Sequence, residues 1–198
     1  MEKTARDRIV EAATRLFAEK GFGGVSLPDI AAAAKVASGE ASKLFSNEAR
    51  LYETVLETQF GLYASRMKAA LVGEKSSEDK IGLMAKAVCE LHEQTPHFFP
   101  LFYRELLNPS PFFETIVKKN IRHVAYLSDN NIARGIQKGI FKYEINPANA
   151  TMLLLGMFHY NFLASQLHET LLPEPGNDAE YLDQVLKVFL TGIKKKKG

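Results

Sequence analysis

Ser26–Phe45 reads SLPDIAAAAKVASGEASKLF, and the organisation of the chain is best understood from this stretch. The hydroxyl of Ser26 can accept one of the backbone N–H groups that the start of a helix leaves unpaired, and Asp29 adds a carboxylate at the positive end of that helix. Pro28 lies in the first turn, where its missing N–H costs nothing. The pattern therefore predicts a helix that begins at Ser26.

A second short helix is expected after a corner. Residues 35–37 are too few for anything but a tight turn, and Ser38 or Ala37 opens a helix that ends near Phe45. Ile30 and its alanine neighbours form a small apolar face that another helix can approach closely. Two short helices joined by such a turn form a helix-turn-helix, whose second helix can enter the major groove of DNA.

The second helix carries side chains that favour contact with DNA. Its short residues allow the backbone to come close to a duplex, Lys43 can reach a phosphate, and Glu40 can accept a hydrogen bond from the amino group of cytosine. The alternative is that these polar residues form only the solvated face of a three-helix head (residues 1–47). The candidate DNA-binding residues are Ser26, Lys35, Ser38, Gly39, Glu40, Ser42 and Lys43.

These residues and their surroundings resemble the head of the tetracycline-repressor (TetR, AcrR-like) family of bacterial regulators. The resemblance covers about the first quarter of the chain, at fixed spacing and without a gap. The matching residues are Arg8, Ile9, Ala12, Ala13, Leu16, Phe17, Gly21, Phe22, Ser26, Ile30, Ala31, Val36, Gly39, Phe45 and Leu51. The remainder of the chain is similar to the family only in its helical organisation.

The resemblance implies an all-α fold with two parts. Residues 1–47 are expected to form a helix-turn-helix DNA-binding domain, and residues 48–198 a helical bundle for ligand binding and dimerisation. The implied partners are double-stranded operator DNA, a small apolar or aromatic effector and a second copy of the chain.

The chain departs from the family pattern at positions where contact with DNA matters. The family usually has Gly where this chain has Lys35, and an aromatic residue, commonly Tyr, at Ser42. Its Lys at the start of the fourth helix is replaced by Glu48, and the following Glu by Ala49. These changes remove two expected phosphate donors, and each lost phosphate contact weakens DNA binding. Glu48 does suit a helix N-terminus, so this change favours the fold.

Charge indicates that any phosphate binding depends on placement. The 198 residues carry a formal charge of +2, and an apolar share of 46% is ample for a folded core. Met1–Arg50 contains eight basic residues (Lys3, Arg6, Arg8, Arg15, Lys20, Lys35, Lys43, Arg50) and seven acidic ones (Glu2, Asp7, Glu11, Glu19, Asp29, Glu40, Glu48). The head is therefore not a basic arm.

Apolar periodicity predicts helices throughout the chain. Four prolines between Thr95 and Phe113 prevent one continuous helix there. Ile140–Tyr143 allows a short extended piece, although no sheet is expected for it. The expected helices run from about 4 to 20, from 47 or 48 to 72, onward from 77, from 97 to 107, from near 110 to 138, from 147 to 172, and from 178 to 193.

A second site is expected in the body of the chain, where aromatic residues cluster in sequence. Side chains from several predicted helices could converge on them, and an apolar cavity with a few polar groups is what a small-molecule site needs. The alternative is that these residues form ordinary core. The candidate ligand-binding residues are Met84, His92, Phe98, Phe102, Tyr103, Phe113, His123, Tyr126, Phe158 and Asn161.

The last two long helices carry more apolar surface than a monomeric bundle needs. Pairing with a second copy would bury this surface and produce a two-fold homodimer with a four-helix seam. Cys89 is the only cysteine, and the N-terminus lacks a secretory apolar core, so a cytoplasmic protein without a membrane span is expected. The basic tail Lys194–Lys197 is most simply a solvated end.

The sequence offers little support for catalysis or metal binding. The five histidines form no pair at metal-ligand spacing, and His159 and His168 lie nine residues apart on different faces. No nucleophile elbow, glycine-rich phosphate loop or evident acid pair is present. We therefore expect no cofactor, no metal site and no enzymatic activity.

The sequence and the resemblance together predict a ligand-responsive, DNA-binding transcriptional regulator, most simply a repressor released by a small-molecule effector. The alternative is a sensor or binding module with weakened or lost DNA binding that acts through another partner. The substitutions at Ser42 and Glu48 motivate this alternative. A gel shift with the DNA upstream of the protein's own gene distinguishes the regulator from the sensor module.

Overall fold

The structure is a computed structural model, and it describes residues 3–165 and 178–195. These residues form helices and no β-strand, which confirms the predicted all-α class. Two compact units are present: Met1–Leu62 together with Thr95–Lys119, and Tyr63–Gln94 together with Asn120–Gly198. The helices α4 (Glu48–Leu71) and α7 (Lys118–Gln137) each contribute residues to both units.

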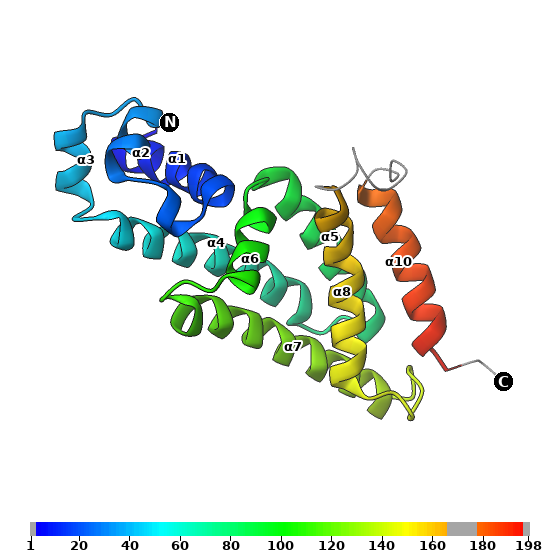
Figure 1. The fold of residues 1–198 in the computed structure, drawn as a ribbon. Helices are drawn as coiled ribbons and strands as arrows, with labels where there is room; N and C mark the ends of the chain where they lie inside the picture. The colour runs from blue at the N-terminus through cyan, green and yellow to red at the C-terminus, as the bar shows by residue number, and fades with distance from the viewer. Residues whose placement is uncertain (1–2, 166–177, 196–198) are drawn as a thin grey trace. The chain divides into compact units, whose positions relative to one another are not determined.

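The first unit contains the three helices of the head. Figure 1 shows α1 (Ala5–Lys20), α2 (Leu27–Ala33) and α3 (Ser38–Leu44) grouped at the blue end of the colour scale. A single 3-10 turn, η1 (Phe22–Gly24), connects α1 to α2. The residual parts of this unit are the start of α4, α6 (Phe98–Leu107) and the π-helical turn η2 (Phe113–Val117).

The apolar faces predicted for these helices form the core of the head. Helix α1 starts with a reciprocal cap between Thr4 and Asp7, and it ends at Gly21, whose φ of 79° suits glycine. The residues Ile9, Ala13, Phe17, Ile30, Ala31, Ala41 and Leu51 are fully buried, and Phe45 is 5% exposed. Small alanines at the contacts let α1, α2 and α3 approach closely.

An aromatic cluster extends this core toward the later part of the unit. The ring of Tyr52 from α4 meets Phe17 edge-on, with their centroids 4.7 Å apart, and it lies 4.9 Å from Phe22. Phe112, which precedes η2, lies 6.2 Å from Phe22 and 6.3 Å from Tyr52. Residues far apart in sequence thus pack around one tyrosine within the first unit.

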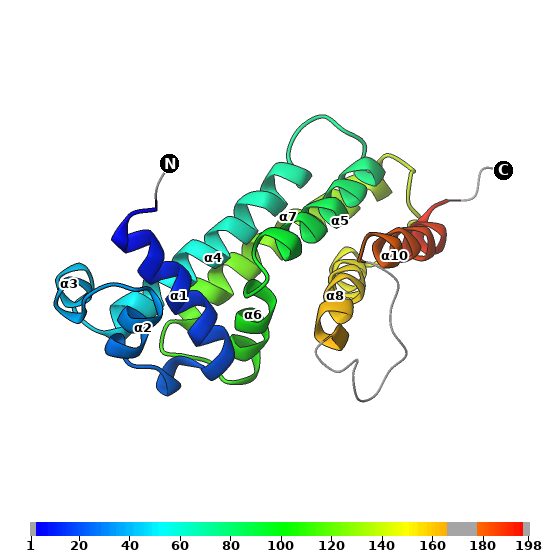
Figure 2. The same cartoon turned by 90° about the horizontal axis from the view of Figure 1, so that it is seen from above.

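The second unit is a helical bundle. It contains the end of α4, α5 (Ser77–Gln94), most of α7, α8 (Pro147–Ser165) and α10 (Asp178–Ile193). Figures 1 and 2 both show α10 beside α8, and α10 packs on α5 as well. The buried face of α10 comprises Leu182, Val185, Phe189 and Ile193, as its apolar spacing predicts.

Two side-chain contacts fix α7 against the start of α5 in this unit. The hydroxyl of Ser77 donates to the carbonyl of Asn131 at 2.9 Å, and the Asn131 amide donates to the carbonyl of Ser77 at 2.9 Å. Gly135 lies directly beside the buried ring of Phe141 and the side chain of Ser77. A side chain at position 135 would occupy the space of that ring.

The short extended piece predicted near Ile140 takes part in an isolated β-bridge. Phe141 pairs antiparallel with Lys194. The N–H of Lys142 donates to the carbonyl of Ile193, and that of Lys195 donates to the carbonyl of Ile140. This bridge attaches the end of α10 to the connection between α7 and α8, so a sheet is not needed to satisfy these backbone groups.

The other boundaries agree closely with the sequence predictions, and the proline-rich tract shows how α6 and α7 are separated. The predicted helix from near 110 begins instead with η2, whose wider turn precedes the regular helix α7. The predicted end of the 147–172 helix, the break at 173–176 and His168 lie outside the described residues. The division into functional domains at residue 47 stays a prediction.

Candidate nucleic-acid interface

Helix α3 presents nearly all of its side chains to solvent. Ser38, Gly39, Glu40, Ser42 and Lys43 are exposed, whereas Ala41 is fully buried against the rest of the head. One buried alanine therefore holds the helix in place, and the candidate contact residues lie on its free surface. Such a surface, with short side chains and a lysine near its end, can approach the floor of a groove.

The turn before α3 has an unusual backbone. Lys35 adopts φ of 54°, a left-handed conformation that costs an L-residue with a side chain roughly 1–2 kcal/mol relative to glycine. The N–H of Lys35 donates to the carbonyl of Ala32, and that of Val36 donates to the carbonyl of Ala31. These bonds close the corner tightly. The departure from glycine at this position thus places an exposed cation next to α3 at the cost of strain.

Replacing Lys35 with glycine should relieve this strain. We expect Lys35→Gly to raise the free energy of unfolding by about 1 kcal/mol, measured by urea denaturation. Lys35→Ala is the matched control, because it removes the charge and the long side chain but keeps the Cβ that causes the strain. If the two variants were equally stable, the backbone conformation described for Lys35 would be wrong.

The start of α2 is capped as its sequence predicts. The N–H of Asp29 donates to the Ser26 hydroxyl at 3.3 Å, and the N–H of Ser26 donates to the Asp29 carboxylate at 3.1 Å. The hydrogen bonds from Ser26 hold the pKa of Asp29 below its usual value. Ser26 therefore has a structural role at the half-exposed start of α2, and any contact with DNA would be additional to it.

Glu48 has a contact that the sequence alone does not indicate. Its Oε1 accepts a hydrogen bond from the N–H of Leu27, the first residue of α2, at 2.8 Å. This bond, with a further backbone bond at Glu48 itself, lowers the pKa of the carboxyl group. The carboxylate thus caps α2 from the start of α4 and joins the two helix N-termini. The Oε1 atom of Glu48 is therefore directed toward the first residue of α2.

Similar contacts account for most acidic residues of the head. Asp7, Asp29 and Glu48 each accept backbone N–H groups at helix starts, where the helix dipole offsets their charge. Glu11 pairs with Lys3 and Glu19 with Arg15. Among the described residues, Arg6, Lys35 and Lys43 form no ion pair with a carboxylate. The near-neutral sequence of the head therefore leaves cations available on its surface.

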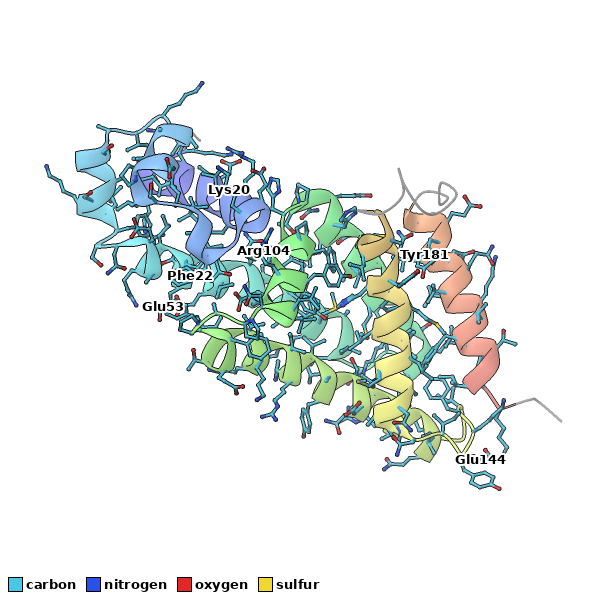
Figure 3. All side chains as sticks on the ribbon, viewed as in Figure 1. Lys20, Phe22, Glu53, Arg104, Glu144 and Tyr181 are labelled. Atoms are coloured by element: carbon cyan, nitrogen blue, oxygen red, sulfur yellow. The ribbon has the colours of Figure 1, made fainter. Side chains whose placement is uncertain are left out.

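Helix α6 holds the C-terminal end of α1. The guanidinium of Arg104 donates from Nε to the carbonyl of Ala18 at 3.1 Å and from its terminal nitrogen to that of Glu19 at 2.6 Å. Figure 3 shows Arg104 directed toward the end of α1, near Lys20. The chain passes close to the guanidinium at Gly21, where a Cβ would lie 3.2 Å from it. One side chain thereby satisfies carbonyls that the helix end leaves free.

The next residue of α6 holds α4. Glu105 is 1% exposed and accepts a hydrogen bond from the Tyr52 hydroxyl at 2.5 Å. Its other oxygen accepts from the Ser110 hydroxyl at 3.0 Å. Burial and the adjacent carboxylate raise the pKa of Tyr52. Neighbouring residues of α6 therefore bind two different helices of the first unit.

Three candidate ligand-binding residues of the first unit, Phe98, Phe102 and Tyr103, form one aromatic group. The ring of Phe102 lies 5.8 Å from that of Phe98 and 5.6 Å from that of Tyr103. It also stacks on the ring of Phe60 from α4 at 5.9 Å, a contact that was not predicted from the sequence. Burial raises the pKa of the Tyr103 hydroxyl. Phe113, at the start of η2, is half-buried.

The candidate residues of the second unit divide by exposure. Met84, Phe158 and Asn161 are buried, and the ring of half-buried His92 lies 4.3 Å from that of Phe162. His123 and Tyr126 on α7 are instead exposed to solvent. The structure therefore brings part of the predicted set into the bundle interior, and ligand binding by any member stays a prediction.

His159 adds a polar group to the interior of the second unit. Its Nε2 has no access to solvent, and its ring lies 6.2 Å from that of Tyr63. Burial lowers the pKa of this imidazole to about 4, so it is neutral at pH 7. The sequence analysis considered His159 only with His168, and their spacing did not support a metal site. In residues 3–165 and 178–195, no group of three potential metal ligands is present.

No helix in the described part of the chain is long and apolar enough to cross a bilayer. Helix α8 has a strongly apolar stretch, but its buried polar residues Thr151 and Asn161 fit the interior of a bundle.

The comparison with known proteins concerns the head most directly. Residues 9–55 match the family described as bacterial regulatory proteins, tetR family. The head of the chain therefore matches the TetR family of transcriptional regulators. The matched range spans the described helices from α1 into α4, including the helix-turn-helix formed by α2 and α3. The resemblance stated from the sequence is thereby confirmed.

Other similarities to known proteins extend beyond the head. The probable HTH-type transcriptional regulator YttP of Bacillus subtilis (strain 168) is 23% identical to this chain over 137 residues. The match covers 68% of this chain and 66% of YttP, slightly under two thirds of that protein. The ketosteroid transcriptional regulator KstR2 of Mycobacterium tuberculosis has a structure with a TM-score of 0.80 at 18% identity, covering 99% of this chain and 98% of that one. FadR from Bacillus subtilis in complex with stearoyl-CoA gives 0.74 at 18% identity, covering 94% and 98%.

These two structures share the fold of this chain over nearly its whole length. At 18% identity, the likeness concerns the fold alone. Three contacts of the first unit could not be predicted from the sequence: the Glu48 cap on Leu27, the Arg104 cap on α1 and the Tyr52–Glu105 bond. Only Glu105 carried a signal, since a glutamate within the apolar stretch of α6 requires a partner when buried.

Proposed function

We propose that this protein is a homodimeric, ligand-responsive regulator of the TetR family, most simply a repressor. Helix α3 of each copy enters the major groove of operator DNA, and two heads occupy successive grooves about 34–36 Å apart. The observation that carries the proposal is the exposure of α3, which is seated by buried Ala41 while Ser38, Gly39, Glu40, Ser42 and Lys43 remain free.

The dimer forms through α8 and α10. Large apolar side chains stand exposed on α8, including Met152 at 75% and Leu153 at 60%, and on α10 at Val188 with 63%. Tyr160 and Leu163 continue the α8 surface at helical spacing, and exposed Gly156 allows a second helix to come close. A two-fold four-helix seam removes this surface from water.

The effector is a small apolar or aromatic molecule bound in the body. Within the second unit, buried Met84 and Phe158 provide apolar surface, and buried Asn161 and the neutral imidazole of His159 provide polar groups. A structural relative whose complex contains stearoyl-CoA supports an apolar ligand for this fold. The proposed contacts come from the buried and half-buried candidates of the second unit, Met84, His92, Phe158 and Asn161.

The effector acts by shifting a conformational equilibrium. It can favour a non-binding conformation only to the extent that it binds that conformation more tightly. Arg104 and Glu105 make α6 a suitable transmitter, because they attach it to α1 and to Tyr52 of α4 in the first unit. A displacement of α6 would therefore change how the heads match the spacing of the operator.

Lys43→Ala tests the docking of α3. We expect the substitution to weaken binding to a duplex taken from upstream of the protein's own gene. The slope of the log of the binding constant against the log of salt concentration should become shallower by about two units, because each of the two copies loses one phosphate contact. Fluorescence anisotropy over a range of salt concentrations measures both quantities.

The control is Lys75→Ala, which removes an exposed lysine outside the head. It should leave both the affinity and the slope unchanged. An unaltered salt titration for Lys43→Ala would contradict the proposed docking. The absence of binding by the unchanged chain would instead favour the sensor module, which the departures at Ser42 and Glu48 motivated. The hydrogen bond from Leu27 to Glu48 explains the presence of this glutamate by its role in the fold, and this role is compatible with DNA binding.

A further inference from the structure

A cation outside the helix-turn-helix is held at the end of α3. Arg6 lies in the first turn of α1, and its guanidinium carbon is 5.4 Å from the centroid of the Phe45 ring. Phe45 directly follows α3 and is 5% exposed, so its ring is anchored in the head. The aromatic face therefore positions the guanidinium beside the C-terminal end of α3.

This contact orients Arg6 without neutralising it. An aromatic ring attracts a cation but carries no net charge, whereas a carboxylate partner would cancel the charge locally. Lys3, Arg15 and Arg50 pair with Glu11, Glu19 and Glu53. Arg6 forms no such pair within residues 3–165 and 178–195, and the adjacent Asp7 carboxylate accepts hydrogen bonds from Thr4. The guanidinium is also exposed and keeps donors available for another ligand.

Helix α3 has no net charge of its own with which to attract DNA. Lys43 and Glu40 are its only charged residues, so the helix itself is neutral. Attraction to a phosphate backbone must then come from elements at its edges, and a planar guanidinium suits a phosphate because it can donate two parallel hydrogen bonds. We propose that Arg6 binds a backbone phosphate of the DNA strand that flanks the end of α3. This inference rests on the proposed docking of α3.

Arg6→Ala is the principal test, with the full chain and a labelled upstream duplex. Loss of one contact per copy should make the slope of log K against log salt about two units shallower. Because a phosphate contact carries no sequence information, binding to a scrambled duplex should show the same change. The loss should be largest at low salt and should shrink as salt is raised.

Two further variants separate this role from others. Arg6→Lys retains a cation and should recover part of the slope. Arg122→Ala, which removes an exposed arginine of α7, should behave as the unchanged chain. A loss for Arg6→Ala that stays constant at all salt concentrations would indicate a folding role and overturn the proposal, as would a loss confined to the upstream sequence.

The experiments distinguish a wrong assignment of Arg6 from a protein that does not bind the duplex at all. If the unchanged chain binds and Lys43→Ala flattens the slope while Arg6→Ala does not, the assignment of Arg6 is wrong and the docking of α3 stands. If the unchanged chain binds no upstream duplex, the proposed function is overturned together with this inference.

Discussion

Replacing Leu153 with lysine should convert the chain from dimer to monomer and lower its affinity for the upstream duplex by about 100-fold or more. Leu153 is 60% exposed on the apolar face of α8, so a lysine is tolerated in the isolated chain. In a two-fold seam, the substitution would bring two desolvated ammonium groups, one from each copy, into the interface. The seam would then be disfavoured strongly.

The expected loss of affinity follows from linkage of the two heads. When a dimer has one head bound, the second meets its half-site at a high effective concentration, and this linkage can raise overall affinity by about 10²–10⁴. A monomer loses that gain although its α3 is unchanged. Sedimentation equilibrium gives the oligomeric state, and anisotropy gives the affinity for the duplex.

Tyr143→Lys provides the matched control for Leu153→Lys. Tyr143 is 84% exposed and lies in the connection between α7 and α8, away from the proposed seam. The control adds the same charge in place of an exposed apolar residue, and it should remain dimeric with unchanged affinity. A Leu153→Lys chain that still dimerises and binds normally would show that the α8 face is not the interface.

The largest expected effect on folding concerns Gly135. An alanine Cβ there would lie 2.3 Å from two ring carbons of Phe141 and 3.1 Å from the Cβ of Ser77. The Phe141 ring is 1% exposed and cannot move away freely. We expect Gly135→Ala to lower the free energy of unfolding by about 2 kcal/mol, as measured by urea denaturation, because overpacking outweighs the gain in helix propensity.

Gly82→Ala is the control with the opposite expected sign. Gly82 lies in α5, and no neighbouring atom would come within 4 Å of an added Cβ. The substitution should raise the free energy of unfolding by about 0.5–1 kcal/mol, because alanine loses less backbone entropy in a helix. Equal effects of the two substitutions would mean that Phe141 does not pack against Gly135 as described.

The fold was largely predictable because its signals are local. Capping by Ser26 and Asp29, the glycine stop after α1 and the apolar spacing in α10 each depend on residues within a few turns of one another. The π-helical start of the region before α7 was not predictable, since proline spacing shows where a helix is interrupted but not how it resumes.

The exposed surface of α3 was predictable from the sequence, whereas the electrostatics of the head were not. A count of charges describes the head as nearly neutral, yet Asp7 and Asp29 cap helices and Glu48 reaches from α4 to Leu27. The Glu48 contact joins residues 21 apart in sequence. The packing of Arg6 on Phe45 spans a still longer separation. Tertiary contacts of this kind leave no periodic pattern in the sequence.

The body was the least predictable part. Aromatic residues close in sequence suggested one group, and Phe98, Phe102 and Tyr103 do lie together. Periodicity could not show that His123 and Tyr126 would be exposed, because amphipathic aromatic and imidazole side chains occur on both faces of a helix. Nor could it show that Nε2 of His159 would be shielded from solvent.

The central claim is that two copies place α3 in successive major grooves of one operator. Dimethyl sulfate footprinting of the chain's own upstream DNA tests it directly, because this reagent methylates guanine N7, an atom that lies in the major groove. The account predicts two protected patches, related by two-fold symmetry and separated by about 34–36 Å along the helix axis. Protection of a single patch, or of no guanine at saturating protein, would contradict it.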